Sequence, residues 1–175
     1  MGAKPGRKKK MSSSTPESLT AAVITVSDSC VQGERTDVSG PAVAELLRQR
    51  SFAVVGSEIV PDEQGTIQKA IRYWVGEARL VVTTGGTGVA ERDVTPEATR
   101  ATCERLLEGV AERMRFEGAK KTPLAALSRG VCGVRGKSLI LNLPGSPTGA
   151  VDSLQTVIDL LPHALQLLGG NTRHP

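Results

Sequence analysis

The sequence predicts an α/β domain built around a largely parallel sheet. Three apolar runs with β-strand character, at residues 21–26, 52–60 and 80–84, alternate with segments whose apolar residues recur at helical spacing. Polar or glycine-rich residues follow each run, as expected where a buried strand ends in a loop. Two later β-like segments, 131–134 and 138–143, are joined by a short turn typical of a hairpin, so the predicted sheet is mixed.

The first two helices are expected between these strands. Ser39-Gly40-Pro41 is a typical helix start, because proline is well tolerated in the first turn. A second helix follows Asp62, which is expected to be its N-cap. The apolar residues of this second helix form the clearest helical face in the chain: Ile67, Ala70, Ile71, Trp74 and Val75.

The second half of the chain is expected to contain further helices. One runs from Thr95-Pro96 to about Leu107. Residues 110–129 are expected to form two helical pieces separated at Thr122-Pro123, where proline interrupts the pattern. A last helix is expected to bend at Pro162 and to end at two glycines.

Charge and composition argue against several classes of protein. The chain of 175 residues has a net charge of +4, but five basic residues and one acidic residue lie in residues 1–18, so the remainder is neutral. A nucleic-acid-binding domain would carry positive charge on its folded part, so no nucleic-acid partner is expected. Aromatic residues make up 2% of the chain, too few for a surface that stacks bases. No run of 18 apolar residues occurs, so no membrane span is expected.

Residues 1–18 are expected to form a disordered basic tail, and residues 19–175 one folded domain. The tail combines proline, serine and a lysine run without apolar periodicity, and it lacks the apolar centre of a secretory signal. A solvated extension and a surface-binding patch both remain open. The cysteines Cys30, Cys103 and Cys132 form no paired motif, so neither a zinc site nor a disulfide framework is expected. Reduced thiols fit a cytoplasmic protein.

Four polar loops are expected to meet at one edge of the sheet, because the carboxyl ends of parallel strands gather there and bind ligands. They comprise residues 27–33, 61–65, 85–93 and 144–149. In the third loop, Gly85-Gly86-Thr87-Gly88 lets several backbone N–H groups converge on an anion. This sequence is neither a Walker A motif nor a dinucleotide fingerprint, so it predicts either a phosphate site or a tight turn.

Asp62 and Asp93 are the candidate metal ligands. Each precedes an expected helix, so helix capping alone would explain both. At neighbouring strand ends beside a glycine-rich loop, two carboxylates would instead suit Mg²⁺, which binds through one or two carboxylates plus substrate phosphates. The histidines, His163 and His174, lie in the last helix and at the C-terminus, so histidine-dependent chemistry is not expected.

Two further polar residues lie at the ends of expected elements. Asn142 interrupts an apolar strand, which is costly unless its amide is hydrogen bonded, so it either fixes the next loop or contacts a ligand. Ser128 is expected to cap or end its helix, and no Ser-His-Asp pattern supports a role as nucleophile.

Seven motifs occur in order along residues 21–168. They are TVSDS (25–29), VPDE (60–63), TTGGTG (83–88), RDVTPEAT (92–99), TPL followed by LSR (122–129), GVRG (133–136) and LNLPGS (141–146). In this order they resemble the molybdopterin adenylyltransferase family, which includes a bacterial enzyme and the G domains of gephyrin and its plant counterpart. The eukaryotic G domains are the most similar, through VCGVRGK (131–137) and LPHA (161–164).

This resemblance implies a three-layer α/β/α fold with a mostly parallel mixed sheet, assembled as a homotrimer. It implies transfer of AMP from Mg²⁺-ATP to the phosphate of molybdopterin, with release of pyrophosphate, in molybdenum cofactor biosynthesis. A separate molybdenum insertase would use the product. Asp62 and Asp93 match the catalytic carboxylates that hold Mg²⁺ and ATP. The resemblance places the following residues at the nucleotide or substrate site: Ser27, Asp28, Gly85, Gly86, Thr87, Gly88, Ser128, Asn142, Pro144, Gly145 and Ser146.

The implied reaction suits these residues, because nucleotidyl transfer depends mainly on positioning and charge neutralisation and needs no histidine base. Two alternatives are a non-catalytic molybdopterin-binding or scaffolding trimer and a nucleotide-binding α/β domain with an unrelated substrate. The presence of both acids and of the complete glycine loop favours the enzyme.

Overall fold

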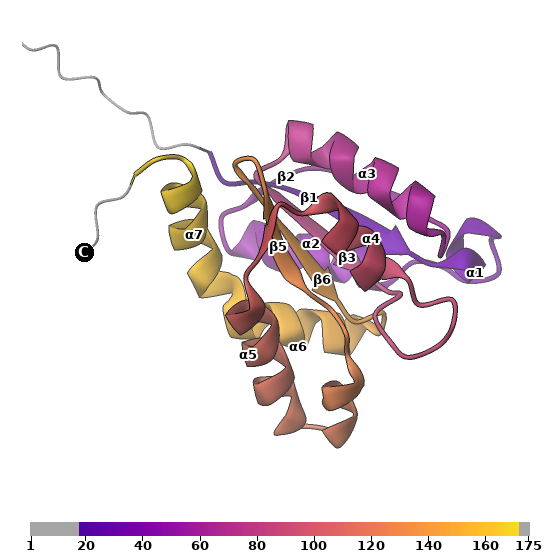
Figure 1. The fold of residues 1–175 in the computed structure, drawn as a ribbon. Helices are drawn as coiled ribbons and strands as arrows, with labels where there is room; N and C mark the ends of the chain where they lie inside the picture. Colours follow the sequence, from indigo (N-terminus) through magenta and orange to yellow (C-terminus); the bar gives the residue numbers. More distant parts are fainter. Residues whose placement is uncertain (1–17, 172–175) are drawn as a thin grey trace, which may run out of the picture.

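The computed structural model describes residues 18–171 of the protein (Figure 1). The predicted tail lies outside the described residues except for Ser18, and so does His174. Six strands form one sheet in the order β2-β1-β3-β6-β5-β4. Their bounds are β1 (Thr20–Val26), β2 (Ala53–Val60), β3 (Leu80–Thr84), β4 (Arg105–Leu106), β5 (Cys132–Arg135) and β6 (Ser138–Leu143). The first four strands in the sheet order are parallel and the last two pairings are antiparallel, which confirms the predicted mixed sheet.

Helices cover both faces of the sheet and produce three layers (Figure 1). One face carries α2 (Ser39–Gln49), α5 (Glu108–Ala119), α6 (Pro147–Val157) and α7 (Leu161–Leu168), and the other carries α3 (Gln64–Glu77) and α4 (Thr95–Thr102). Successive residues of β1 alternate between two apolar cores, since Val23 belongs to one and Ile24 to the other. A strand buried on both faces favours apolar residues on both, which explains the apolar run at residues 21–24.

The parallel strands end together at one edge of the sheet. Thr25 of β1 is paired with Thr84 of β3, and Thr84 with Leu143 of β6. After β1 the chain crosses one face of the sheet through α2, and after β3 it continues on the other face through α4. The connections of the neighbouring strands β1 and β3 therefore diverge, and this is where α/β sheets open a ligand-binding crevice.

Three local predictions were wrong in detail. Asp62 is not the N-cap of α3, which is Glu63, because the Asp62 carboxylate turns towards the loop after β1. The helix expected to reach Leu107 ends at Thr102, where the chain instead pairs with β5 as the short strand β4. The loop expected at 27–33 contains a helical turn, α1 (Asp28–Val31), whose N-cap is the side chain of Ser27.

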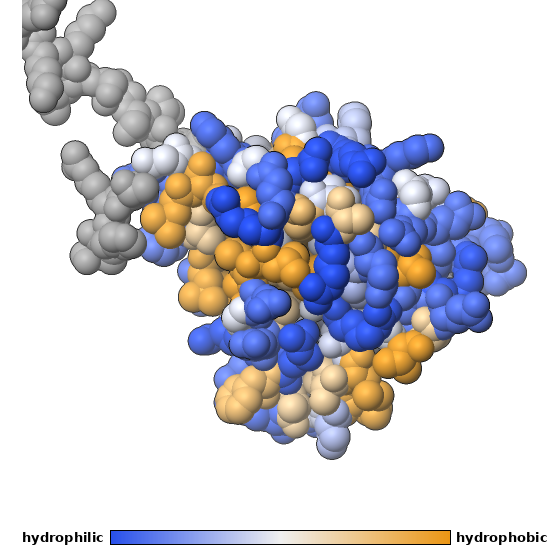
Figure 2. Space-filling view, in the orientation of Figure 1, coloured by the Kyte–Doolittle hydropathy of each residue, from blue (hydrophilic) through white to orange (hydrophobic). Residues whose placement is uncertain are grey.

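Proline marks the other helix breaks as predicted. The pieces expected within 110–129 are α5 and a 3-10 helix, η1 (Pro123–Leu127). The last helical segment breaks at a second 3-10 turn, η2 (Ile158–Leu160), and Pro162 lies in the first turn of α7. Apolar side chains are exposed where α5 meets η1, at the bottom of Figure 2: Phe116, Leu124 and Leu127. Within the described part of the chain, no helix is long and apolar enough to cross a membrane.

Candidate active site

A cavity of about 630 Å³ lies at the edge where the parallel strands end. The four loops predicted to meet at this edge all contribute to its walls. Eight of the predicted site residues line it: Ser27, Asp28, Asp62, Gly85, Gly86, Asp93, Gly145 and Ser146. Thr87, within the glycine loop, is buried, and neither it nor Gly88 lines the cavity.

Asp28 and Asp62 join the loops after β1 and β2 by reciprocal hydrogen bonds. The backbone N–H of Asp28 donates to Asp62 Oδ2 at 2.9 Å, and the backbone N–H of Asp62 donates to Asp28 Oδ1 at 2.9 Å. Arg92 adds two hydrogen bonds to Asp28 Oδ2, from Nε at 2.9 Å and from Nη2 at 2.5 Å. These contacts hold two carboxylates close together at the cavity wall.

The two carboxyl groups have opposite electrostatic environments. Burial raises the pKa of Asp62 above its ordinary value, and the negative charges of Asp28 and Asp93 raise it further. The hydrogen bond from the Asp62 backbone lowers the pKa of Asp28, with Arg92 as a second cause. A carboxylate that is disfavoured by burial and by like charges gains most from a nearby cation, so Asp62 is suited to metal binding.

The glycine loop passes close to both predicted metal ligands. Gly85 and Gly86 have φ angles of +102° and +65°, which favour glycine. A Cβ atom at Gly86 would lie 3.1 Å from Asp62 Oδ1, and one at Gly88 would lie 2.7 Å from Asp93 Oδ2. Both acids therefore lie beside the same loop, on one rim of the molecule, as expected from the sequence.

The donor set fits a cation that is shared with a substrate. Within residues 18–171, no hydrogen bond occupies Asp62 Oδ1, and the contact of the Asp93 carboxylate is made by Oδ2, which accepts from the backbone N–H of Ala90 at 2.9 Å. The same residues contain no group of three or more His, Cys, Asp or Glu side chains arranged to hold a metal. Two carboxylates are what Mg²⁺ uses when substrate phosphates supply further ligands, whereas a resident structural metal needs a fuller cage.

Arg129 fixes the loop that carries Asp93. Its backbone N–H donates to Thr87 O at 2.8 Å, its Nε to Gly88 O at 2.7 Å and its Nη2 to Asp93 O at 2.6 Å. The guanidinium also pairs with Glu97 of α4 and lowers the pKa of that carboxyl group. Sequence reasoning missed Arg129, although it stands directly after Ser128 in the LSR motif.

A fifth segment of the cavity wall, residues 35–39, was also missed. Asp37 accepts hydrogen bonds from Thr25 Oγ1 at 2.7 Å and from the backbone N–H of Gly40 at 3.0 Å. It thereby ties the start of α2 to the end of β1. An acid just before a predicted helix start is the signal that would have found it, because such residues satisfy free N–H groups of the first turn.

The remaining predicted residues lie at a second, smaller cavity of about 30 Å³, lined by Ser128, Asn142 and Pro144. Asn142 is buried, and its Nδ2 donates to Thr83 Oγ1 at 3.0 Å and to Thr99 Oγ1 at 2.9 Å. Its Oδ1 accepts from the backbone N–H of Val131 at 3.2 Å. These internal bonds favour the first of the two interpretations of Asn142, in which it fixes neighbouring segments.

Known proteins are similar to this chain in sequence and in fold. A family model described as a probable molybdopterin binding domain matches residues 22–163. The chain belongs to this family. The molybdenum cofactor synthesis protein cinnamon of Drosophila melanogaster is 48% identical over 87% of the chain, which spans 26% of that protein. The molybdopterin adenylyltransferase of Helicobacter pylori strain J99 is 40% identical, with 89% of the chain and 90% of the relative covered.

A solved structure confirms the predicted fold class. The crystal structure of the molybdopterin biosynthesis enzyme MoaB from Thermus thermophilus matches with a TM-score of 0.82 and 51% sequence identity. The match covers 87% of this chain and 97% of that one. The family resemblance carried by the seven motifs is therefore confirmed by both sequence and fold.

Proposed function

We propose that the protein is a molybdopterin adenylyltransferase, a nucleotidyltransferase of molybdenum cofactor biosynthesis. It transfers AMP from Mg²⁺-ATP to the terminal phosphate of molybdopterin and releases pyrophosphate. The single observation that carries the proposal is the placement of Asp62 and Asp93 beside Gly86 and Gly88 at the wall of the large cavity. The name of the H. pylori relative, which the chain covers almost completely, supports the same reaction.

The nucleotide would bind along the glycine loop. Asp62 and Asp93 would hold Mg²⁺, which neutralises phosphate charge when it is bound. Gly86 would direct its backbone N–H group towards the phosphates, because its left-handed backbone opens the turn. The N–H of Gly85 donates to Leu143 O at 3.1 Å and fixes the start of the loop. Ser146, the N-cap of α6, brings the positive end of that helix to the same wall.

Molybdopterin would approach from the side of the smaller cavity. The loop that begins at Pro144 lies against the glycine loop, since Thr84 Oγ1 donates to Pro144 O at 2.7 Å and a Cβ at Gly145 would lie 3.3 Å from Gly85 Cα. Ser128 and Pro144 line the smaller cavity, and Pro144 directly precedes Gly145 at the wall of the large one. A phosphate oxygen of molybdopterin attacks the α-phosphorus of ATP, and the bond to the pyrophosphate leaving group breaks. No protein base is required, because the attacking phosphate is already ionised at neutral pH.

We also propose that the enzyme is a homotrimer that acts in the cytoplasm and passes its product to a separate molybdenum insertase. The family resemblance supports the trimer, and the exposed apolar side chains of Phe116, Leu124 and Leu127 offer surface for assembly. Light scattering should give three times the chain mass of 18.4 kDa. A monomer at micromolar concentration would contradict the trimer without affecting the proposed reaction.

The enzymatic proposal is tested with purified protein, molybdopterin and Mg²⁺-ATP. We expect adenylylated molybdopterin and pyrophosphate in equal amounts, and a loss of both in Asp62→Asn and Asp93→Asn. Asp159→Asn is the matched control, since Asp159 pairs with Arg50 on the surface, away from the cavity. Tight molybdopterin binding without product, under conditions where a known adenylyltransferase works, would refute the enzyme and favour the scaffolding alternative.

A further inference from the structure

Carboxylates outnumber cationic side chains at the wall of the large cavity. Asp28, Asp37, Asp62 and Asp93 line it, and among the described residues Arg35 is the one cationic side chain in that lining. A nucleoside triphosphate is itself strongly anionic, so it is repelled from these walls unless cations intervene. A divalent metal held by two of the acids would neutralise part of this negative charge, and a mobile side-chain cation would neutralise more of it.

Arg92 supplies such a cation at the rim. It directly precedes Asp93, and its Nε and Nη2 both donate to one oxygen, Asp28 Oδ2, at 2.9 and 2.5 Å. The side chain of Arg92 is 62% exposed and that of Asp28 is 31% exposed. An ion pair with this much solvent around it is weak, so it opens at little cost in free energy.

The surroundings of Arg92 remain in place when its side chain leaves. Asp28 keeps its reciprocal hydrogen bonds with the backbone and carboxylate of Asp62. Arg129 holds the loop backbone through Gly88 O and Asp93 O. The guanidinium of Arg92 is therefore the part of this charge cluster that is free to exchange partners.

We propose that Arg92 is an exchangeable counter-ion of the nucleotide site. It pairs with Asp28 while the site holds no nucleotide, and it moves onto the phosphates when a metal–nucleotide complex binds. The metal then replaces the positive charge beside the aspartates, and the guanidinium fork matches phosphate oxygens in two parallel hydrogen bonds. This inference rests on the proposed function, because it requires a metal–nucleotide complex beside Asp62 and Asp93.

The test compares two affinities in Arg92→Ala. Without Arg92, nucleotide-free protein should bind Mn²⁺ about threefold more tightly, because a competing surface charge is gone. The same variant should bind a non-hydrolysable ATP analogue with Mg²⁺ about 10- to 100-fold more weakly, because a charge-assisted contact to phosphate is lost. Electron paramagnetic resonance gives the first affinity, and titration calorimetry gives the second.

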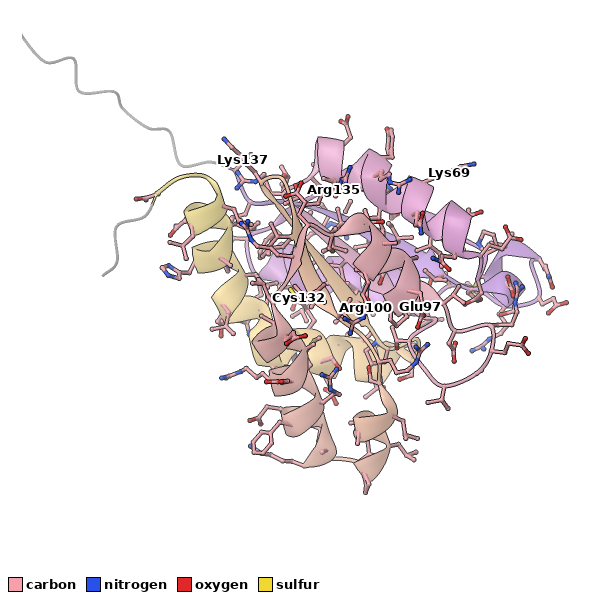
Figure 3. The ribbon with its side chains drawn as sticks, viewed as in Figure 1. Lys69, Glu97, Arg100, Cys132, Arg135 and Lys137 are labelled. Carbon is pink, nitrogen blue, oxygen red and sulfur yellow. The ribbon has the colours of Figure 1, made fainter. Side chains whose placement is uncertain are left out.

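Two further variants separate direct contact from general charge. Arg100→Ala is the matched control. Arg100 is exposed on α4 (Figure 3) and does not line the cavity, so its loss should change neither affinity. Arg92→Lys keeps the charge and loses the fork, so Mn²⁺ affinity should equal that of the wild type while nucleotide affinity falls part of the way. Both measurements are repeated at about 0.5 M salt, where long-range attraction is screened and direct contact persists.

The movement itself has a spectroscopic readout. The ¹H–¹⁵Nε signal of Arg92, identified by its absence in Arg92→Lys, should stay near its starting position with Mg²⁺ alone and shift when Mg²⁺ and the ATP analogue are added together. The inference is overturned if the signal does not shift with the nucleotide, or if both affinities fall together in Arg92→Ala. Either result means that Arg92 stays paired with Asp28 and has only a structural role. A wild-type protein that binds no Mg²⁺-nucleotide overturns the proposed function as well, whereas normal wild-type binding with an unaffected Arg92→Ala overturns the inference alone.

Discussion

Both the backbone conformation of Gly86 and the atoms around it disfavour a side chain at this position. Its φ angle of +65° lies in the left-handed region, and a Cβ atom there would overlap Thr95 Oγ1 and lie 3.1 Å from Asp62 Oδ1. Thr95 is buried and its hydroxyl donates to Gly85 O at 2.9 Å, so it has little freedom to turn away. Gly86→Ala is therefore expected to disturb both the stability of the fold and the position of Asp62, the proposed metal ligand.

The expected loss of stability is the sum of two local costs. A non-glycine residue in the left-handed region costs about 1–2 kcal/mol. Displacing the Thr95 hydroxyl loses its hydrogen bond to Gly85, which contributes about 1 kcal/mol. The free energy of unfolding of Gly86→Ala should therefore fall by about 2–3 kcal/mol. Affinity for Mn²⁺ should fall as well, because the new methyl group displaces the Asp62 carboxylate.

Gly136→Ala is the matched control. Gly136 lies in the turn between β5 and β6 with a φ of +56°, and no atom lies within 4 Å of a Cβ built there. It shares the backbone strain without the contacts, so about 1–2 kcal/mol of destabilisation and unchanged Mn²⁺ affinity are expected. Urea denaturation followed by Trp74 fluorescence measures both variants. Equal destabilisation in the two, with Mn²⁺ binding intact in Gly86→Ala, would refute the packing argument.

Two other predictions concern ionisable groups. Arg129 lowers the pKa of Glu97 from 4.5, so the stabilisation from this pair is complete above that pH and is lost as the pH falls through the lowered folded-state value. Glu97→Gln should lower the free energy of unfolding by about 0.5–1 kcal/mol at pH 7, since the pair is partly exposed. A difference in stability from the wild type that is undiminished in strong acid would contradict this. Burial raises the pKa of Cys103 to about 11 and that of Cys132 to about 12, so neither should react with a thiol reagent at pH 8 in folded protein. Cys30 lines the cavity and should react with the reagent, and its reaction should be slower when Mg²⁺-ATP is present. Three reactive thiols in protein without denaturant would contradict the described packing.

Local pattern was enough to predict most of the fold. The mainly apolar runs of β1 and β3 follow from burial on both faces, and the face of α3 around Ile67 and Ile71 follows from helical spacing. The four loops at the carboxyl ends of the strands could be placed together because parallel strands all point the same way. The site was therefore predictable wherever strand order alone determines which loops are neighbours.

Contacts between residues far apart in the chain were not predictable from pattern. Asp62 looked like a helix cap, but its partner is Asp28, 34 positions earlier, and only the parallel pairing of β1 with β2 brings them together. The short strand β4 replaces the end of a predicted helix because backbone groups of Glu104 and Leu107 bond to β5. Arg129 escaped notice for the same reason: its guanidinium acts on backbone oxygens about 40 positions away.

Crystals grown with Mn²⁺ and a non-hydrolysable ATP analogue would show where the metal and the nucleotide bind. The anomalous signal of Mn²⁺ identifies the metal without reference to any assumed site. We expect one peak within about 2.2 Å of carboxylate oxygens of Asp62 and Asp93, with the triphosphate lying along Gly85–Gly88. A Mn²⁺ peak that contacts neither aspartate, or a nucleotide bound outside the large cavity, would contradict the assignment of this rim as the site of AMP transfer.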